Sequence, residues 1–495
     1  MRTQPWVLAF LSGIIIGLSY LPFHLGFFAY FGFIPLFHIW LNHDYKTNIQ
    51  SGYIFGLVYN TISNYWMATN SGAEFSVVIF SLISAVFYLS IYWGIAGAIV
   101  GLLRKKSTVF ICLPFLIVSL EWIRSFGPLG FPWGNLALTQ TNYLPILQYN
   151  DYAGPYIVSF FIILMNNFIY KVIYNINITL MHQITFFFVL VFFFIGGWLR
   201  IFYHRPSLKT IDVSVIQPNI DPNKKWDYAN RENTIIFMDS LHTEAINQDP
   251  DIILFPETAL PTYLRLNNRL KKSLQNKVNE SGIPILIGTV DRVINSSGKK
   301  IYHNSAMYLH PFKEYEMYEK IHLVPFAEYD LMPNISIPLG KLNLNIDRGI
   351  FKGGKDYKVF RYKTVNFSDL ICYESSFPRY AREFVKNGAK ILMIQANDGW
   401  LGESAGPYQH FENARLRAIE NRIPIVRSAN TGISGVISPT GQIQRKIPLG
   451  KETVFMETIS INSSLSFYSK YGDVFAAISF VIFLFIGPVN CTKND

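Results

Sequence analysis

The chain has 495 residues, of which 50% are hydrophobic, 16% aromatic and only 15% charged, and its formal net charge is +10. Soluble chains usually carry about 25% charged residues, so this composition excludes an ordinary soluble protein and indicates a membrane protein. The positive charge does not indicate nucleic acid, because no basic block or nucleic-acid motif accompanies it. Lysines and arginines instead cluster in short loops between apolar segments, as they do in membrane proteins.

Apolar segments predict about eight membrane-spanning helices, and all but the last precede a long polar stretch. They lie at Trp6–Leu21, Phe27–Leu41, Tyr53–Met67, Val77–Leu103, Val109–Trp122, Tyr156–Tyr170, Ile184–Phe202 and Val474–Val489. Several are near the short limit for a span, and the third and fifth are the least clearly defined. Only Arg2 precedes the first segment and further spans follow it, so we interpret it as a membrane anchor and not as a signal peptide.

The charges of the loops predict the orientation in the membrane. The loops on the side of the N-terminus contain most of the basic residues, which are Arg2, Lys46, Arg104, Lys105, Lys106, Lys171 and Lys493. Because basic residues mark the cytoplasmic side, we expect a multi-pass membrane protein with both termini in the cytoplasm. In a Gram-negative bacterial cell this is the inner (cytoplasmic) membrane, with the polar stretch facing the periplasm. The predicted parts are a transmembrane bundle over 1–203, a periplasmic domain over 204–470, and a last transmembrane helix with a short cytoplasmic tail over 471–495.

The polar stretch has the pattern of an α/β domain. Short β-rich segments occur at Ile211–Gln217, Asp251–Phe255, Pro284–Val290, Ser368–Cys372, Lys390–Gln395 and Pro424–Ser428. Helical patterns lie between several of them, at Asn230–Asn247, Leu264–Glu280, Arg379–Lys386 and Gln409–Asn421. Strands that alternate with helices predict stacked layers of sheet and helix.

Cys372 is the residue of this domain that most suggests chemistry. The chain has 3 cysteines, and Cys112 lies in an apolar segment and Cys491 in the C-terminal tail, so no disulfide framework is expected. Cys372 stands between a predicted strand and the start of a helix, where the helix dipole and free backbone N–H groups favour a thiolate. The same N–H groups can stabilise an oxyanion, so the position suits a nucleophile for acyl transfer.

A carboxylate and a lysine at other strand ends complete the requirements of such a site. Glu257 follows an apolar strand and a proline, and burial there would raise its pKa toward that of a general base. Lys320 lies before an apolar segment and can stabilise negative charge. Taken singly, each has an ordinary interpretation: a Glu at a helix start, a solvated Lys, a Cys that packs as a small apolar residue. His322 is expected to be structural, and nothing near it has the spacing of metal ligands.

Together these segments resemble the nitrilase, or carbon–nitrogen hydrolase, superfamily, whose catalytic residues occur in the chain order Glu, Lys, Cys. Over nearly its full length the chain resembles the bacterial apolipoprotein N-acyltransferase family. The matching segments are Gln217-Pro218-Asn219-Ile220, Lys225-Trp226, Pro256-Glu257-Thr258-Ala259-Leu260-Pro261, Tyr302-His303-Asn304-Ser305, Lys320 to Glu328, Ile371-Cys372-Tyr373-Glu374 and Asn397-Asp398-Gly399-Trp400. Ala327 departs from the glycine that is more usual there.

The resemblance implies a nitrilase-like αββα sandwich on a membrane helix bundle, and it assigns roles to individual residues. Glu257, Lys320 and Cys372 would be catalytic, with Glu257 as the base and Lys320 as its partner. Supporting residues would be Glu328 and Glu374, and substrate-binding residues would be Trp226 and Tyr373. No cofactor and no metal is implied.

The implied reaction has two steps and two lipid-bearing partners. Cys372 would take an acyl chain from a membrane phospholipid, typically phosphatidylethanolamine, as a thioester. The acyl chain would then pass to the α-amino group of the N-terminal diacylglyceryl cysteine of an apolipoprotein, the final step of lipoprotein maturation. We further expect Arg124, Phe126, Pro128 and Trp133 at the entrance, and the loop Leu331–Leu344 as a lid.

Two other functions are weighed against acyl transfer. A membrane-anchored amidase of the nitrilase type would hydrolyse a C–N bond with the same three catalytic residues, so these residues cannot separate it from an acyltransferase. A transporter with an inert domain would carry ionisable residues well inside its spans, but Glu74 and Glu121 lie near span ends.

Overall fold

The computed structural model describes residues 4–103, 106–176, 178–329, 341–342, 346–347, 351–461 and 464–491. The chain forms two compact units. The helical unit consists of Met1–Ala68, Val78–His204 and Ser466–Asp495, and the α/β unit consists of Thr69–Val77 and Arg205–Leu465.

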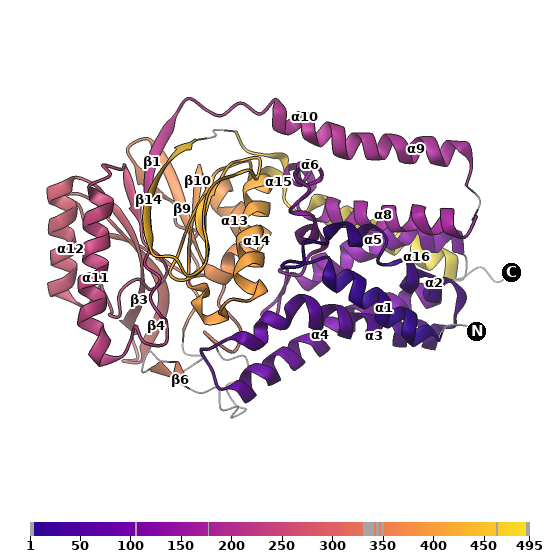
Figure 1. Cartoon of the computed structure of the whole chain (residues 1–495), viewed down its shortest axis with the longest axis horizontal. Coiled ribbons are helices and arrows are strands. Elements are labelled where there is room, and N and C mark those ends of the chain that lie inside the picture. Colours follow the sequence, from indigo (N-terminus) through magenta and orange to yellow (C-terminus); the bar gives the residue numbers. More distant parts are fainter. Residues whose placement is uncertain are drawn as a thin grey trace. The chain divides into compact units, whose positions relative to one another are not determined.

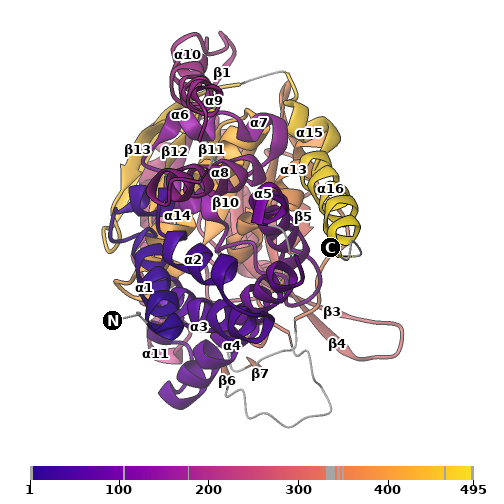
Figure 2. The same cartoon turned by 90° about the vertical axis from the view of Figure 1, so that its right-hand side faces the viewer.

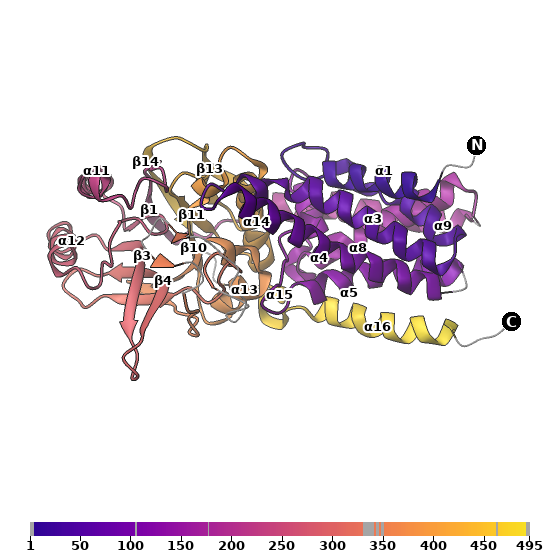
Figure 3. The same ribbon diagram turned by 90° about the horizontal axis from the view of Figure 1, so that it is seen from below.

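The helical unit is a bundle of long and short helices. The longer ones are α1 (Pro5–Leu18), α2 (Ile34–Asn42), α3 (Tyr45–Asn64), α4 (Phe75–Leu102), α5 (Lys106–Arg124), α8 (Tyr156–Ile173), α9 (Leu180–Val191), which continues through the π-helix Phe192–Gly196 into α10 (Gly197–Phe202), and α16 (Val474–Cys491). Short helices are α6 (Leu144–Leu147), α7 (Asn150–Ala153) and α15 (Phe467–Tyr471). In the bundle α1 packs on α3, and α5 packs on both α8 and α16, which lies beside it in Figure 3.

Small residues explain the close packing of α1 on α3. A Cβ atom added at Gly13 would lie 2.8 Å from Cβ of Val58, and one added at Gly17 would lie 2.7 Å from Cβ of Ile62. Two glycines four residues apart thus leave one face of α1 without side chains, so that α3 can approach it closely. Such close van der Waals packing holds helices together in a membrane, where no hydrophobic effect acts between them.

The predicted number of spans is only partly supported. Within the described residues, 3 helices are long and apolar enough to cross a membrane: Phe75–Leu102, Tyr156–Ile173 and Leu180–Phe202. The apolar helices Pro5–Leu18, Gly26–Asn42 and Val474–Ile486 are shorter. The third predicted span corresponds to α3, which begins earlier than predicted, and its polar side chains, such as Asn48 and Asn60, are buried inside the bundle.

The α/β unit contains two six-stranded sheets, with strand orders β14-β1-β2-β3-β4-β5 and β13-β12-β11-β10-β9-β8. The strands of the first sheet are β1 (Thr210–Gln217), β2 (Ile252–Leu254), β3 (Ile285–Ile294), β4 (Lys300–Leu309), β5 (Glu316–Glu319) and β14 (Thr453–Ser460). Those of the second are β8 (Phe360–Tyr362), β9 (Val365–Ile371), β10 (Ile391–Ala396), β11 (Ile425–Ala429), β12 (Ser434–Ile437) and β13 (Ile443–Ile447). A further pair, β6 (Lys341–Leu342) and β7 (Ile346–Asp347), is antiparallel.

Helices cover the outer face of each sheet (Figure 1). Helices α11 (Tyr228–Ile246) and α12 (Asn268–Ser281) cover the first sheet, and α13 (Pro378–Lys386) and α14 (Ala405–Asn421) cover the second. An apolar core that extends between the sheets includes Val213 of β1 and Met393 of β10. The predicted nitrilase-like sandwich of helix, sheet, sheet and helix is therefore confirmed for this unit.

Every strand and helix predicted for the polar stretch is present, but several strands were not predicted. The central strands β1, β2 and β3 run parallel, as do β9, β10 and β11. Parallel strands are buried on both faces and are therefore nearly continuous apolar runs, which the sequence pattern reveals. The antiparallel strands toward the sheet edges were missed. Strand β13 is mostly exposed, and β4 pairs with β3 in the long hairpin that Figure 2 shows projecting from the unit.

The connection between α3 and α4 belongs to the α/β unit. The backbone N–H of Ser71 donates to the carbonyl of Trp400 at 2.7 Å, and the Thr69 hydroxyl donates to the carbonyl of Leu401 at 2.7 Å. Asn223 donates to Ser71 Oγ at 3.0 Å. This loop therefore fixes the 3₁₀ turn Asp398–Leu401, which lies next to the candidate site described below.

Candidate active site

Cys372 occupies a sharp turn at the end of β9. It is the first residue of a 3₁₀ turn, Cys372–Ser376, which leads into α13. Its φ angle is +53°, a left-handed conformation that costs a residue with a side chain about 1–3 kcal/mol and persists only where surrounding contacts impose it. The strand–turn–helix arrangement predicted for this cysteine is present, and the side chain is half-buried.

The thiol is protonated at neutral pH. Burial raises its pKa well above the ordinary value, the charge of Glu257 raises it further, and Lys320 only partly offsets these effects. A base must remove the proton when the thiol attacks.

Glu257 has the properties of that base. It follows β2 and is only 6% exposed. Burial raises its pKa, and the charge of Lys320 opposes this increase. Its Oε1 accepts a hydrogen bond from Nδ2 of Asn304 at 2.7 Å. A carboxylate with a raised pKa and a fixed orientation can accept a proton near neutral pH.

Lys320 lies between two carboxylates at the end of β5. Its Nζ is 2.8 Å from Oε2 of Glu328 and 4.0 Å from Oε1 of Glu257. Burial alone would lower the pKa of Lys320, but Glu328 and Glu257 outweigh this and raise it above the ordinary value. The ammonium group is therefore a permanent positive charge that can stabilise an oxyanion.

Asn304 of β4 connects the two carboxylates and was missed as a site residue. Its Nδ2 donates to Glu257 and, at 2.9 Å, to Oε1 of Glu328. Glu328 also accepts from the backbone N–H of Val324 at 2.7 Å. The signal was present in the segment Tyr302-His303-Asn304-Ser305, but nothing in the sequence shows that β4 places this amide between the carboxylates.

Glu374 is fully buried and connects the cysteine turn with the segment after Lys320. Its carboxylate accepts hydrogen bonds from four donors, all of which are in adjacent loops or strands. These donors are the N–H groups of Ile321 (2.9 Å), His322 (3.1 Å) and Ile371 (3.1 Å) and the hydroxyl of Tyr318 (2.7 Å). Glu374 therefore holds the backbone before Cys372 and the backbone after Lys320, and its supporting role stays a prediction.

The residues predicted to bind substrate lie in different apolar clusters. Trp226 packs in the cluster of Val290, Leu323 and Phe351. The ring of Tyr373 lies 5.2 Å from that of Phe377.

The entrance and lid roles stay predictions, and the structure describes only part of the residues concerned. Arg124 and Trp133 are buried in the helical unit, where Arg124 donates to the carbonyl of Gly134 at 3.0 Å. Phe126 is 44% exposed. The predicted lid Leu331–Leu344 lies outside the described residues except for Lys341–Leu342.

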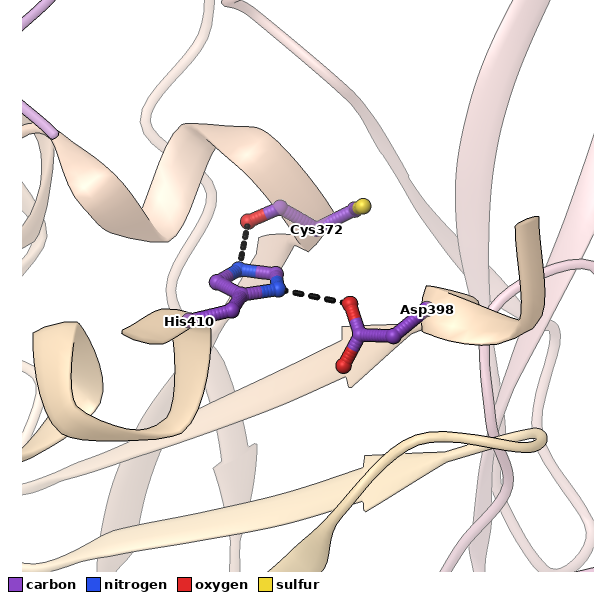
Figure 4. Close-up of side chains that lie close together, drawn as sticks. All are labelled: Cys372, Asp398 and His410. Carbon is purple, nitrogen blue, oxygen red and sulfur yellow. Dashed lines mark hydrogen bonds and ion pairs between the residues drawn. The ribbon is translucent and has the colours of Figure 1, made fainter. Parts of the chain in front are cut away.

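His410 and Asp398 also lie beside Cys372 (Figure 4). Potential ligand atoms of Cys372, Asp398 and His410 lie within 4.8 Å of one another. Both ring nitrogens of His410 already have partners: Nε2 lies 3.0 Å from the Cys372 carbonyl oxygen, and Nδ1 lies 2.7 Å from Oδ1 of Asp398. Arg427 adds a positive charge at Asp398, with Nη2 2.6 Å from Oδ2. A metal ion would have to displace these contacts, so the donor set does not fit one.

Comparisons with known proteins agree with this geometry. The sequence model of the carbon-nitrogen hydrolase family matches residues 212–466, and that of the apolipoprotein N-acyltransferase N-terminal domain matches residues 12–169. The α/β unit with its Glu, Lys and Cys is thus a carbon–nitrogen hydrolase domain.

Relatives match the chain over nearly its full length. The apolipoprotein N-acyltransferase of Geobacter metallireducens is 31% identical over 486 residues, which is 96% of this chain and 92% of that protein. The one of Chlorobaculum tepidum is 27% identical and covers 96% of this chain and 94% of its own length. The chain belongs to the apolipoprotein N-acyltransferase family. Among solved structures, an amidase of Nesterenkonia AN1 from the nitrilase superfamily has a TM-score of 0.39 and 17% identity, over 52% of this chain and 92% of that chain.

The raised pKa of Cys372 predicts the pH dependence of its alkylation. Since only the thiolate reacts, the rate of alkylation by iodoacetamide should rise about tenfold per pH unit and reach no plateau below pH about 8.5. Glu257→Gln should move the profile to lower pH, because it removes a charge that raises the thiol pKa. The Cys372→Ala variant corrects for Cys112 and Cys491. A plateau below pH about 7 would mean that the resting residue is a thiolate after all.

Proposed function

We propose that this enzyme transfers an acyl chain from a membrane phospholipid, through a thioester on Cys372, to the α-amino group of the N-terminal diacylglyceryl cysteine of an apolipoprotein. Membership of the family supports the reaction. The observation that carries the assignment of residues is the convergence of Glu257 and Lys320 on the turn that bears Cys372, with a protonated thiol, a base of raised pKa and a permanent cation.

In the first step Glu257 removes the proton from Sγ as the sulfur attacks the ester carbonyl carbon of the phospholipid. The carbonyl π electrons move to oxygen, and Lys320 stabilises the oxyanion together with backbone N–H groups. When the carbon–oxygen bond to the glycerol breaks, the proton on Glu257 passes to the departing alkoxide. The products are a lysophospholipid and the acyl thioester of Cys372.

In the second step the neutral α-amino group of the apolipoprotein attacks the thioester. Glu257 accepts a proton from the amine nitrogen as the carbon–nitrogen bond forms, and Lys320 again stabilises the oxyanion. The carbon–sulfur bond then breaks, and the thiolate takes the proton from Glu257. The raised pKa of the thiol favours this reprotonation and returns the enzyme to its initial state.

The supporting and substrate-binding roles follow the same scheme. Glu328, which lies 2.8 Å from Nζ of Lys320, would balance the charge of that lysine. Glu374 would hold the turn that bears Cys372 in place. Trp226 and Tyr373 would contact the substrates, because both rings are partly buried among apolar side chains and leave part of their surface accessible.

A membrane location suits both substrates. Lifting an acyl chain out of the bilayer costs about 0.8 kcal/mol per CH₂ group, so the reaction is best carried out at the leaflet surface. We propose about eight spans in the inner membrane, with the shorter apolar helices completed by flanking aromatic residues, and the α/β unit on the periplasmic side.

Reporter fusions test this topology. A fusion at Lys46 or at the C-terminus should report a cytoplasmic location, because basic loops stay on that side, and a fusion at Lys300 in the β3–β4 hairpin should report the periplasm. Cytoplasmic activity of the Lys300 fusion would contradict the proposed orientation.

The amidase alternative uses the same catalytic residues, so only the substrate separates the two. The match of residues 12–169 to the N-terminal domain of the acyltransferase family favours acyl transfer, because an amidase acting on small soluble amides has no need of that part.

Mass spectrometry of the adduct on Cys372 tests the first step. Purified enzyme mixed with detergent-dispersed phospholipid should gain one acyl group, whereas a water-soluble amide should leave it unmodified. Glu257→Gln should lower the rate about 10²-fold, Lys320→Ala by a comparable factor, and Cys372→Ser should abolish the thioester. The exposed Glu280→Gln on α12 is the matched control and should react normally. Acylation by the amide and none by the phospholipid would favour the amidase.

A further inference from the structure

The backbone carbonyl of Cys372 is held by two side chains. Its oxygen accepts a hydrogen bond from Oγ of Ser375 at 2.7 Å, and Nε2 of His410 lies 3.0 Å away from it. Ser375 Oγ and His410 Nε2 are also 2.9 Å apart. Ser375 belongs to the same turn as the cysteine, but His410 is on α14. The nucleophile is therefore connected to the helix that covers the second sheet.

Behind His410 lies a fully buried set of charges. His410, Asp398 and Arg427 are only 1%, 2% and 0% exposed. Nδ1 of His410 is 2.7 Å from Oδ1 of Asp398 and 3.0 Å from Nη2 of Arg427, which also donates to Oδ2 of Asp398 at 2.6 Å. Although burial opposes ionisation, His410 and Arg427 lower the pKa of Asp398 to about 2, so this carboxylate is charged. The ring is thus fixed from three elements: the Asp398–Leu401 turn, α14 and β11.

Hydrogen-bond chemistry decides where His410 carries a proton. The carbonyl oxygen of Cys372 can only accept, so the bond to it requires a proton on Nε2. Nδ1 has both a carboxylate and a guanidinium within reach, so it can donate to Asp398 or accept from Arg427. In a neutral ring with its hydrogen on Nε2, Nδ1 accepts from Arg427. In a ring with a hydrogen on each nitrogen, Nδ1 donates to Asp398. In both forms Nε2 can donate to the carbonyl of Cys372.

The orientation of the ring excludes a direct role on the thiol. In Figure 4 the imidazole faces the carbonyl oxygen of Cys372, and the sulfur points away from it. A His that served as the base for the thiol would use Nε2 or Nδ1 to accept a proton from Sγ, but both atoms are engaged elsewhere. His410 acts on the backbone of the nucleophile.

We propose that His410 is a positioning residue, which holds Cys372 in its left-handed conformation and thereby directs Sγ toward Glu257 and Lys320. The φ angle of +53° lies in the left-handed region, which is strained for a residue with a side chain. A hydrogen bond from a charge-supported donor is strong enough to offset such strain. Without it the peptide can relax toward negative φ, and the Cα–Cβ bond then rotates away from the base. The proposal depends on the proposed role of Cys372 as the nucleophile.

Substitutions at His410 separate this role from others. His410→Leu removes the donor, and thioester formation from phospholipid should fall by about 10²-fold, as for a misdirected nucleophile. His410→Gln can still donate an amide N–H to the carbonyl and should restore most of the lost rate. His242→Leu, which removes another buried histidine of the same unit, is the matched control and should react normally. If His410→Gln is as slow as His410→Leu, the residue acts as a base or a ligand and the proposal is wrong.

A second readout does not depend on phospholipid. The pH profile of Cys372 alkylation should respond to Glu257→Gln in the wild-type background but not in the His410→Leu background, because the thiol would no longer face Glu257. An equal shift in both backgrounds would overturn the proposal. This experiment remains informative if the wild-type enzyme forms no thioester with phospholipid, an outcome that would contradict the proposed function instead.

Thermal unfolding of each variant separates loss of positioning from loss of the fold. Ser375→Ala, which removes the other hydrogen bond to the carbonyl of Cys372, should lower the rate of thioester formation less than His410→Leu does.

Discussion

The site depends on the burial of one ammonium group. Lys320 is 1% exposed, and a buried cation is tolerated only with compensating charge close by. Glu328 at 2.8 Å provides most of this compensation, and Glu257 at 4.0 Å provides the rest. Glu257 is thereby left with the weaker ion pair, and burial raises its pKa although Lys320 opposes this increase, so it is the group that can accept a proton. The electrostatics of one lysine thus distinguish the proposed supporting carboxylate, Glu328, from the proposed base, Glu257.

Two turns of the site have a strained backbone, and in each a buried side chain donates a hydrogen bond to the strained peptide. Cys372 has a φ angle of +53° and Thr258, next to Glu257, one of +46°. His410 bonds to the carbonyl of Cys372, and Nζ of Lys225 donates to the carbonyl of Thr258 at 2.7 Å. Burial lowers the pKa of Lys225 to about 8, and nearby Glu257 limits this decrease. In both turns a donor fixes the peptide and so directs the adjacent functional group, which is preorganisation of the kind that catalysis requires.

The sequence predicted the parts of the fold that have strong local patterns. Buried parallel strands such as β10 are continuous apolar runs, and Glu257 and Cys372 each follow such a strand. Lys320 instead follows the antiparallel edge strand β5, which has no such pattern, so its place in the site was expected only from the family resemblance. Edge strands such as β13 have no such pattern. Asn304 and His410 depend on contacts between distant segments, which no local pattern encodes. The burial that raises the thiol pKa also arises from packing between distant segments and has no local pattern in the sequence. Several apolar helices of the bundle are shorter than a full span. Packed glycines and buried asparagines also lie inside the bundle, where a count of apolar residues does not register them.

The central claim is that the thioester on Cys372 is passed to an amine and not to water. Acyl-enzyme prepared with phospholipid should be separated from excess lipid and mixed either with a peptide that begins with diacylglyceryl cysteine or with buffer alone. Decay of the thioester, followed by mass spectrometry, should be rapid with the peptide and slow in buffer, because an amine is the better nucleophile toward a thioester. The peptide should gain exactly the acyl group that the enzyme loses. Equal decay in both mixtures, with free fatty acid as the product, would contradict acyl transfer and identify a hydrolase.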